Sequence, residues 1–434
     1  MDTSPAEQVD AERRGGLWRD LDFLKFWSGE SLSMVGTQIS FVAVPLLAVS
    51  VLDASPFQMG LLNAAQFAPF LVLTLFAGVW VDRTLRRPLL VGTNLGRAVL
   101  FGAIPLAAFT GVLDIWLLSL LVLLAASLTV VFELAYQSYL PSLVRRDQLV
   151  EGNGKLEGSR SFAQLAGPGA AGVLVAAATA PVAIVIDALT FLAAGVTQMF
   201  IRRPEPAPSR PEGGRPSVTV EIGQGLRLLL RNPYLRALGI EAAAYNLFNQ
   251  MLWAVLILHL SRGLDLHPAV IGVVLTMSGV GALLGSVVSG WLGRRWGLGR
   301  TLIVTILVAN AAPLLIPLAP AGHAIAAPVI GAALLINGVG LVAYNIQAIS
   351  LRQAAVTTDV LGRTNAGYRF AVTGTAAIGA LIGGALGGVI GLRATMVVGA
   401  LGALAAVWIV IRSPIPALRD LSQVTPDEPA SVTR

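Results

Sequence analysis

Long apolar runs alternate with short polar segments along almost the whole chain. A helix needs about 20 apolar residues to cross the roughly 30 Å hydrocarbon layer of a bilayer. Twelve runs of suitable length, bounded by charged, proline or turn residues, lie within residues 24–52, 58–81, 89–112, 115–138, 160–179, 181–201, 237–261, 269–293, 301–320, 326–350, 371–391 and 394–412. The pattern predicts an all-α membrane protein with twelve transmembrane helices.

Composition agrees with this fold class. Of the 434 residues, 12% are charged and 55% apolar, and the mean hydropathy is +0.74. Soluble chains carry about 25% charged residues, so this balance suits a chain solvated by lipid. The net charge of +6 does not indicate nucleic acid, because the basic residues are dispersed between apolar runs.

The missing residue types exclude several kinds of site. Cysteine is absent, so we expect no disulfides, thiolate metal sites or cysteine nucleophiles. The three histidines fall near predicted span ends or loops, so we expect neither a metal cluster nor a cofactor. No G-x-x-x-x-G-K-[ST] run occurs, so the chain should not hydrolyse ATP. No nucleophile, base and orienting group share a motif, and we do not expect an enzyme.

The basic residues predict the orientation in the membrane. When the 30 Lys and Arg residues are assigned to loops and span ends, only Arg262 and Arg393 fall on one side. The positive-inside rule makes the opposite side cytoplasmic, with both termini on it. Residues 1–22 mix acidic and basic side chains, unlike a cleavable signal peptide, so the first span should remain as an anchor.

The spans fall into two related halves. The run Gly78 to Arg83 closes the second span as Gly290 to Arg295 closes the eighth, and Glu30 and Glu241 stand early in spans one and seven. A Pro, Gly and Arg-rich linker and an amphipathic surface helix should join the halves. A 6+6 repeat is typical of transporters whose site lies between the halves. The expected segments are a tail at 1–22, a half at 23–201, a linker at 202–235, a half at 236–413 and a tail at 414–434.

The loop after the second span carries a recognisable motif. Gly78-Val-Trp-Val-Asp82-Arg83-Thr84-Leu85-Arg86-Arg87 resembles the G-x-x-x-D-R-x-G-R-R/K motif of the major facilitator superfamily, with Leu85 in place of glycine. The resemblance implies a gating role and places Asp82 near the start of span eleven, around residues 365–369. Alternatively, the arginines only set the topology in the anionic headgroup zone.

A second motif lies in span five. Gly167-Pro168-Gly169-Ala170-Ala171-Gly172 resembles the G-P-x-x-G-G motif of the antiporter branch of that superfamily, with Ala171 in place of a glycine. Proline removes a backbone donor and small neighbours allow a close helix approach, so a bendable, tightly packed seam is expected. An ordinary kinked helix is the alternative.

The run Leu351-Arg352-Gln353, followed by Leu361-Gly362-Arg363-Thr364-Asn365-Ala366 and Tyr368-Arg369, resembles the LRQ…LGRxNAxxR run of the bacterial exporter branch, which includes macrolide-efflux and enterobactin-exporter-like proteins. The resemblance extends from Trp27 to about Arg412. It implies a multi-pass protein of the bacterial inner membrane that exports small molecules, and we expect it to be a monomer.

Two rows of small residues recur at four-residue spacing. Such rows let another helix approach closely, either as fixed packing or as a sliding seam. For span eleven we expect the row to face a helix of the same half. The rows are Gly379, Gly383, Gly387 and Gly391 in span eleven, and Gly281, Gly285, Ser289 and Gly293 in span eight.

Polar residues inside the spans are the candidate site. An ionisable group in hydrocarbon is costly, so each should face the bundle interior or a wet cavity. Because Asp187 lies toward the outer end of span six, we expect Glu133 rather than Asp187 to pair with Arg97. The candidates are Glu30, Ser33, Thr37, Gln38 and Ser40 in span one, Arg97 in span three, Thr129, Glu133 and Tyr136 in span four, Asp187 in span six, Glu241, Tyr245 and Asn249 in span seven, and Asn337 and Tyr344 in span ten.

These groups allow several readings. A buried carboxyl group favours its neutral form and can exchange a proton, with Glu30 the preferred carrier and Glu241 its counterpart; alternatively, the carboxylates only pair or cap helices. Proton antiport of cationic or large, mostly apolar compounds is the favoured function. A facilitator or symporter importing a nutrient, and a membrane scaffold or receptor, are the alternatives. The expected partners are lipid, a small-molecule substrate and protons.

Overall fold

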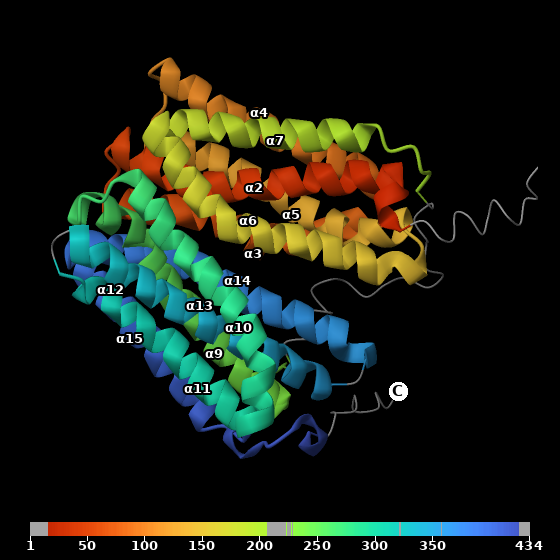
Figure 1. The fold of residues 1–434 in the computed structure, drawn as a ribbon, viewed down its shortest axis with the longest axis vertical. Coiled ribbons are helices and arrows are strands. Elements are labelled where there is room, and N and C mark those ends of the chain that lie inside the picture. The colour runs from red at the N-terminus through yellow and green to blue at the C-terminus, as the bar shows by residue number, and fades with distance from the viewer. Residues whose placement is uncertain are drawn as a thin grey trace, which may run out of the picture.

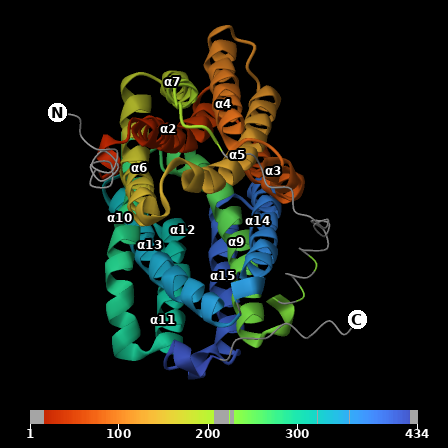
Figure 2. The same ribbon diagram turned by 90° about the vertical axis from the view of Figure 1, so that its right-hand side faces the viewer.

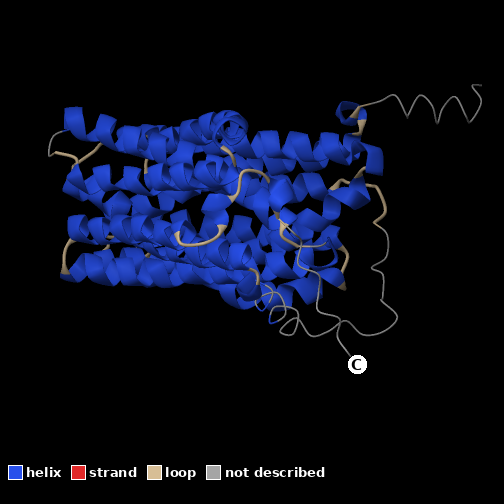
Figure 3. Ribbon diagram, turned by 90° about the horizontal axis from the view of Figure 1, so that it is seen from below, coloured by secondary structure: helices blue, strands red, loops and turns tan. Residues whose placement is uncertain are grey.

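The computed structural model describes residues 16–205, 223, 227, 229–320, 323–356 and 358–424, and within these ranges every long element is a helix (Figure 3). The long helices are α2 (Leu21–Ser50), α3 (Pro56–Asp82), α4 (Arg86–Phe109), α5 (Ile115–Leu143), α6 (Leu149–Ala177), α7 (Ala180–Met199), α9 (Pro233–Leu258), α10 (Pro268–Trp296), α11 (Leu298–Ala311) continued by the short α12 (Leu315–Leu318), α13 (His323–Ala354), α14 (Thr358–Val389) and α15 (Leu392–Ile411).

The predicted membrane helices are present. Eleven helices of the described chain are long and apolar enough to cross a membrane. The twelfth predicted span corresponds to α6, which begins at Leu149 rather than near residue 160. Its first three turns carry polar residues in the run LVEGNGKLEGSR, which lowers the apolar content of the helix. The predicted tails and linker lie mostly outside the described residues.

Side-chain caps explain where several helices start. The Asp20 carboxylate accepts from the backbone N–H groups of the first turn of α2, and the Asn232 side chain does the same for α9. Before α3, Ser55 and Gln58 form a capping box, and Pro56 occupies the first helical position. These side chains satisfy backbone donors that have no partner within the helix.

The helices form two bundles, α2–α7 and α9–α15 (Figures 1 and 2). Two long helix pairs join the bundles: α6 packs on α10, and α3 packs on α14. These are spans five and eight, and spans two and eleven. Each pair maps onto the other when the two halves are exchanged, as a repeat of six spans requires.

The halves meet at one end and diverge at the other. We call the end that holds the start of α2 and the ends of α7 and α15 the termini end, and the opposite end the far end. The bundles separate toward the termini end (Figure 1). At the far end, one cluster of buried apolar residues draws on both halves, including Val44 and Leu256. Toward the termini end each half has its own cluster, one around Phe23 and one around Leu302. Apolar burial therefore holds the far end closed.

Glycine pairs allow this closure. A Cβ on Gly172 in α6 would lie 2.8 Å from the Gly272 Cα in α10. A Cβ on Gly60 in α3 would lie 2.6 Å from the Gly384 Cα in α14. Contacts this short leave no room for a side chain, so both joining pairs depend on glycine.

Most residues of the two predicted rows of small residues pack within the C-terminal half. In α14, Gly379 and Gly383 face the α9 backbone at Leu247 and Met251. Gly387 contacts Val255 of α9 as well as Pro56, whereas a Cβ on Gly391 would meet nothing within 4 Å. The row in α10 faces α13, where Ser289 donates to the Ala343 carbonyl oxygen. Packing within one half is thus confirmed for Gly379 and Gly383.

Candidate functional site

A cavity of about 260 Å³ lies within the N-terminal half. Eight predicted site residues from α2, α4 and α5 line it. The lining residues are Glu30, Ser33, Met34, Thr37, Gln38, Arg97, Thr129, Phe132, Glu133, Tyr136, Arg160, Ala163 and Gln164. All of them come from the first half, and among the described residues none of the C-terminal half lines this cavity.

Glu30 is buried at the edge of this cavity, with 1% of its surface exposed. Gln198 of α7 donates from Nε2 to Glu30 Oε1. The Gln198 Oε1 atom accepts in turn from Asn94 Nδ2 at 3.0 Å. Since Gln198 and Asn94 are both fully buried, Glu30 is held by a continuous amide chain that joins α2, α7 and α4.

Arg97 is the cation of this cluster. Its guanidinium carbon lies 4.0 Å from the centroid of the Phe132 ring and 4.4 Å from that of Phe191. Its Nη2 donates to Asn94 Oδ1 at 2.6 Å. The planar group is thus held between two aromatic faces, a position that suits guanidinium better than ammonium.

The prediction that Glu133 pairs with Arg97 is wrong. Among the described residues Arg97 forms no ion pair with Glu133, whose Oε2 instead lies 3.5 Å from Nη2 of Arg369. Arg97 stacks on Phe191, which stands one turn from Asp187 on α7. Asp187 lies near the middle of α7 and Arg97 near the middle of α4. The two residues are therefore at similar depths in the bundle. The prediction failed because it counted Asp187 from the outer end alone.

Asp187 itself is fully buried behind the cavity wall. The Thr190 hydroxyl donates to Asp187 Oδ1 at 3.3 Å, whereas Asp187 Oδ2 and the nearby Ser40 Oγ have no hydrogen-bond partner among the described residues. Gly36 of α2 faces this carboxyl group, and a Cβ there would overlap both Asp187 and Thr190. Glycine at position 36 therefore makes room for the buried acid.

Glu133 has a different environment. Its side chain is 39% exposed, and its Oε2 lies 3.5 Å from Nη2 of Arg369 in α14. This ion pair links the cavity wall of the N-terminal half to the C-terminal half. Beside it, the Tyr136 ring stacks on Phe132 at 5.8 Å and approaches Phe26 at the same centroid distance. The wall here combines one acid with aromatic faces.

The candidates of the C-terminal half gather elsewhere. Tyr344 donates from its hydroxyl to Glu241 Oε2 at 2.7 Å, and Glu241 is buried like Glu30. Asn337 donates to the Ala309 carbonyl oxygen at 2.8 Å, while Tyr245 and Asn249 are half-buried on α9. Glu30 and Glu241 are both buried acids at equivalent positions of the two halves, as the sequence predicts. Only Glu30 lines the cavity.

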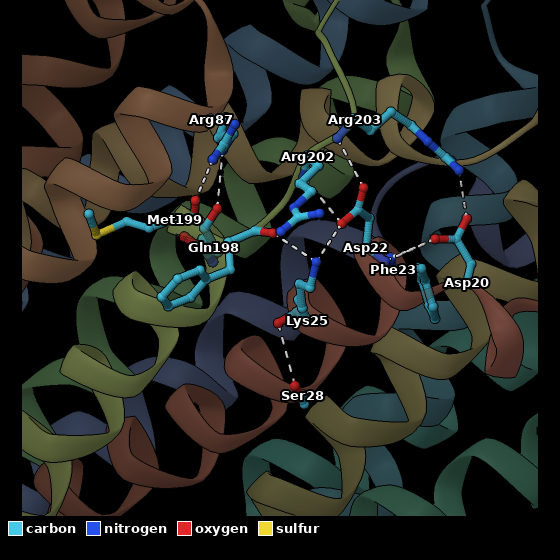
Figure 4. A network of polar contacts seen from close by, with 11 residues as sticks. Asp20, Asp22, Phe23, Lys25, Ser28, Arg87, Gln198, Met199, Arg202 and Arg203 are labelled. Carbon is cyan, nitrogen blue, oxygen red and sulfur yellow. Dashed lines mark hydrogen bonds and ion pairs between the residues drawn. The ribbon is translucent and has the colours of Figure 1, made fainter.

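The arginines of the loop motif contact the ends of other helices (Figure 4). The Glu205 carboxylate accepts from the backbone N–H groups of Arg86 and Arg87, at 2.8 and 3.0 Å. Arg87 also donates to the carbonyl oxygens of Gln198 and Met199 at the end of α7. These contacts fasten the start of α4 to the end of α7, so the two arginines do more than set topology.

Other parts of the motif are less informative. Arg83 follows the end of α3 and is exposed. Gly78 and Asp82 lie outside the residues whose side-chain surroundings the structure describes, and so does Asn365. The expected approach of Asp82 to the start of span eleven therefore stays a prediction, although α3 and α14 do pack together.

The span-five motif lies in the seam between the halves. A Cβ on Gly167 would overlap Gln38, so this glycine lets α2 approach α6 beside the cavity. Further along the same motif, the Pro168 carbonyl and Gly172 face Gly272 of α10. One short segment thus contacts both a cavity residue and the other half, as a tightly packed seam requires.

Sequence reasoning missed the neutral members of the cluster. Asn94 and Gln198 lie on spans three and six, whereas the neutral polar candidates come only from spans one, four, seven and ten. Their amides have the same need for partners in hydrocarbon, so counting every polar residue in the spans would have identified them. Phe191 carried no such signal, since an aromatic residue in a span is ordinary.

Comparison with known proteins agrees with this architecture. The Major Facilitator Superfamily profile matches residues 26–355 and 238–431. A crystal structure of a bacterial homologue of the iron transporter ferroportin in an inward-facing state superposes with a TM-score of 0.70 at 18% identity, covering 90% of this chain and 98% of that one. The nucleoside transporter NupG gives 0.68 at 10% identity, covering 90% and 98%.

Curated relatives share more of their sequence with this chain than these two structures do. Macrolide efflux protein A of Streptococcus pyogenes is 24% identical over 228 residues, 52% of this chain and 56% of that protein, so the chain spans about half of that relative. The uncharacterized MFS-type transporter YfiS of Bacillus subtilis is 25% identical over 396 residues, 86% of this chain and 88% of that protein. The profile match across the chain, with the two helix bundles, shows that this multi-pass membrane protein is a transporter of the Major Facilitator Superfamily.

Proposed function

We propose that this protein is a secondary active transporter that exports amphipathic small molecules from the bacterial cytoplasm by proton antiport. The observation that carries the proposal is the position of Glu30. It is a buried carboxyl group that lines the cavity, and Gln198 and Asn94 link it by hydrogen bonds to the Arg97 guanidinium. A second buried acid, Asp187, stands one turn before Phe191, on which Arg97 stacks. A site of this kind can exchange a proton and bind a ligand in the same place.

Charge balance supports proton exchange. When Glu30 and Asp187 are both ionised, Arg97 alone compensates them, and an uncompensated charge inside the bundle is costly. A proton on either acid removes the excess negative charge. Loss of that proton restores the excess and strengthens the attraction of a cationic ligand. Proton and ligand would therefore compete, which is the requirement for antiport.

The lining of the cavity supports an amphipathic substrate. Phe132, Tyr136 and Met34 offer apolar and aromatic surface, while Glu30 and Glu133 offer negative charge. Ligand sites of this kind combine mostly apolar walls with a few polar groups that orient the ligand. The names of the macrolide efflux relatives support antibiotics of that type as substrates.

The shape supports alternating access. With the termini end on the cytoplasmic side, as the positive-inside rule predicts, the halves at 23–201 and 236–413 open toward the cytoplasm and close outward. Export requires the two halves to rock about the cavity until the far end opens. The glycine contacts of α6 with α10 and of α3 with α14 are the seams along which this movement would occur.

Flux measurements in proteoliposomes test the proposal. Purified protein is reconstituted, and movement of labelled erythromycin and of labelled tetraphenylphosphonium is followed with and without an imposed pH gradient. The parent should accumulate at least one probe against its gradient only when the pH gradient is present. Glu30→Gln should lose this accumulation but retain exchange of the probe at equal concentrations, because exchange needs no net proton movement.

The matched control is Glu157→Gln, which removes an exposed carboxylate of α6 that does not line the cavity. It should transport like the parent. Equal transport with and without the pH gradient would instead identify a facilitator. Flux of neither probe above that of protein-free liposomes would reject the proposed substrate class.

A further inference from the structure

We propose that the termini end of the C-terminal half binds the headgroups of anionic phospholipids. The binding surface, called here the arginine patch, lies where the ends of α10 and α15 meet the start of α11. It consists of five exposed arginines: Arg294, Arg295, Arg300, Arg412 and Arg419.

The two halves differ sharply in charge. Residues 16–205 contain 12 acidic and 12 basic residues and are neutral. Residues 236–424 contain 4 acidic and 11 basic residues, a net charge of +7. The positive-inside rule asks for arginines at the termini end of both halves and does not explain why only one half lacks compensating acids.

Ion pairing follows the same division. Five basic residues at the termini end of the N-terminal half have carboxylate partners within that half: Lys25 with Asp22, Arg86 with Glu205, Arg145 with Asp147, Lys155 with Glu151, and Arg203 with Asp20. Among the described residues, the C-terminal half places only Arg262 and Arg369 in ion pairs, each with an acid of the other half. No arginine of the patch has a carboxylate partner in the described chain.

The fold gathers the patch at one place. The backbone N–H of Leu298 donates to the Arg419 carbonyl oxygen at 2.9 Å, and that of Gly299 donates to the Leu418 carbonyl oxygen at 2.9 Å. These bonds bring the segment after α15 onto the turn between α10 and α11, at the bottom of Figure 2. Charges from three chain segments therefore share one surface.

Tryptophans locate this surface at the membrane interface. The Trp291 and Trp408 side chains are 52% and 54% exposed, and their rings lie 5.9 and 4.9 Å from the guanidinium carbons of Arg295 and Arg412. One turn further into α10, Val287 is 79% exposed, as expected of a lipid-facing residue. Tryptophan and arginine beside an apolar belt are typical of headgroup depth.

A lipid is the partner that this arrangement fits best. An anionic phospholipid offers a phosphate for the arginines and acyl chains for the apolar belt beside them. A nucleic acid or a soluble anion would use only the charge and would leave the tryptophans without a role. Bidentate pairing of guanidinium with phosphate gives the contact its strength.

Lipid retention in native mass spectrometry tests the proposal. The full chain is purified from nanodiscs of equimolar phosphatidylcholine and phosphatidylglycerol, and the lipids that stay bound are counted. The parent should retain phosphatidylglycerol in preference. Each arginine near an anionic surface contributes about a fivefold factor, so the triple variant Arg294→Gln, Arg295→Gln, Arg300→Gln should reduce the preference about a hundredfold.

Two variants keep the test specific. Arg145→Gln removes an exposed arginine that Asp147 already neutralises at 2.6 Å, and it should leave the preference unchanged. The triple variant Arg294→Lys, Arg295→Lys, Arg300→Lys keeps the charge but loses bidentate pairing, so it should retain more of the preference than the glutamine variant and less than the parent. Parent-like retention by the triple glutamine variant would overturn the proposal. Displacement of phosphatidylglycerol by millimolar inorganic phosphate would also overturn it, by assigning the patch to free phosphate.

Discussion

Arg262 Nη2 lies 2.5 Å from Asp53 Oδ1, and this ion pair joins the end of α9 to the loop after α2 at the far end. The same guanidinium donates to the Val49 carbonyl oxygen at 2.9 Å and to the Ala54 carbonyl oxygen at 3.1 Å. Carbonyls at the end of a helix attract a cation. Arg262, one of two basic residues expected on the outer side, therefore ties the two halves together there.

The hydrogen bonds from Arg262 to the two carbonyl oxygens should contribute more to closure of the far end than the ion pair with Asp53. The Asp53 side chain is 95% exposed, and exposed pairs contribute only about 0–1 kcal/mol. We expect Asp53→Asn to shift the opening equilibrium of the far end less than about fivefold. Arg262→Gln also loses two charge-assisted bonds, each worth about 1.5–3 kcal/mol when shielded from water, and should shift it further.

Labelling of a single cysteine measures this shift. The chain has no cysteine, so Asn63→Cys introduces a unique thiol beside a small cavity at the seam, lined also by Phe41 and Trp253. The rate of reaction with a membrane-impermeant maleimide reports opening of the far end. Equal rates in Arg262→Gln and Asp53→Asn would show that the carbonyl bonds contribute nothing to closure.

Closure of the far end should also depend on Gly272. An added methyl group would face the Pro168 carbonyl and the Gly172 backbone of α6, across the seam rather than within one half. We expect Gly272→Ala to fold normally but to raise labelling of the cysteine at position 63. Gly158→Ala, on α6 where a Cβ would meet nothing within 4 Å, is the control and should label like the parent.

How far the sequence predicts this molecule depends on the kind of contact. Every span except α6 follows from apolar length alone, which bilayer thickness dictates. Buried acids could be identified for the same reason: Glu30, Asp187 and Glu241 stand inside apolar runs, where charge is costly. Their partners could not. Gln198 reaches Glu30 and Tyr344 reaches Glu241 only because α7 and α13 pack where they do, and the sequence does not state which helices are neighbours.

Arg97 should be the residue on which the buried cluster depends for stability. Removing one partner of a buried charge group costs about 3–5 kcal/mol because the remaining charge stays uncompensated. Arg97→Gln leaves Glu30 and Asp187 without a cation and should lower the thermal unfolding midpoint in detergent markedly. Arg97→Lys keeps the charge but not the planar stacking on Phe132 and Phe191, and should lower it less.

A double variant tests whether the loss is electrostatic. If Arg97 compensates Glu30, then adding Glu30→Gln to Arg97→Gln should restore part of the lost stability, since it removes one uncompensated charge. Additive losses in the double variant would mean that Arg97 acts through packing on the two rings and not through its charge.

Of two glycines five residues apart on α14, only Gly383 should be sensitive to an added methyl group. A Cβ on Gly383 would lie 2.5 Å from the Met251 Cα in α9, a backbone atom that cannot move aside as a side chain can. Overpacking of this kind costs about 1–3 kcal/mol, so Gly383→Ala should lower the thermal midpoint and the yield of monodisperse protein.

A Cβ on Gly388 would meet nothing within 4 Å, so Gly388→Ala should stay within about 0.5 kcal/mol of the parent. Both variants share one helix and one chemical change, so a general effect of alanine on α14 would lower both midpoints equally. That outcome would contradict the close packing of α14 on α9 as the reason for the glycine row.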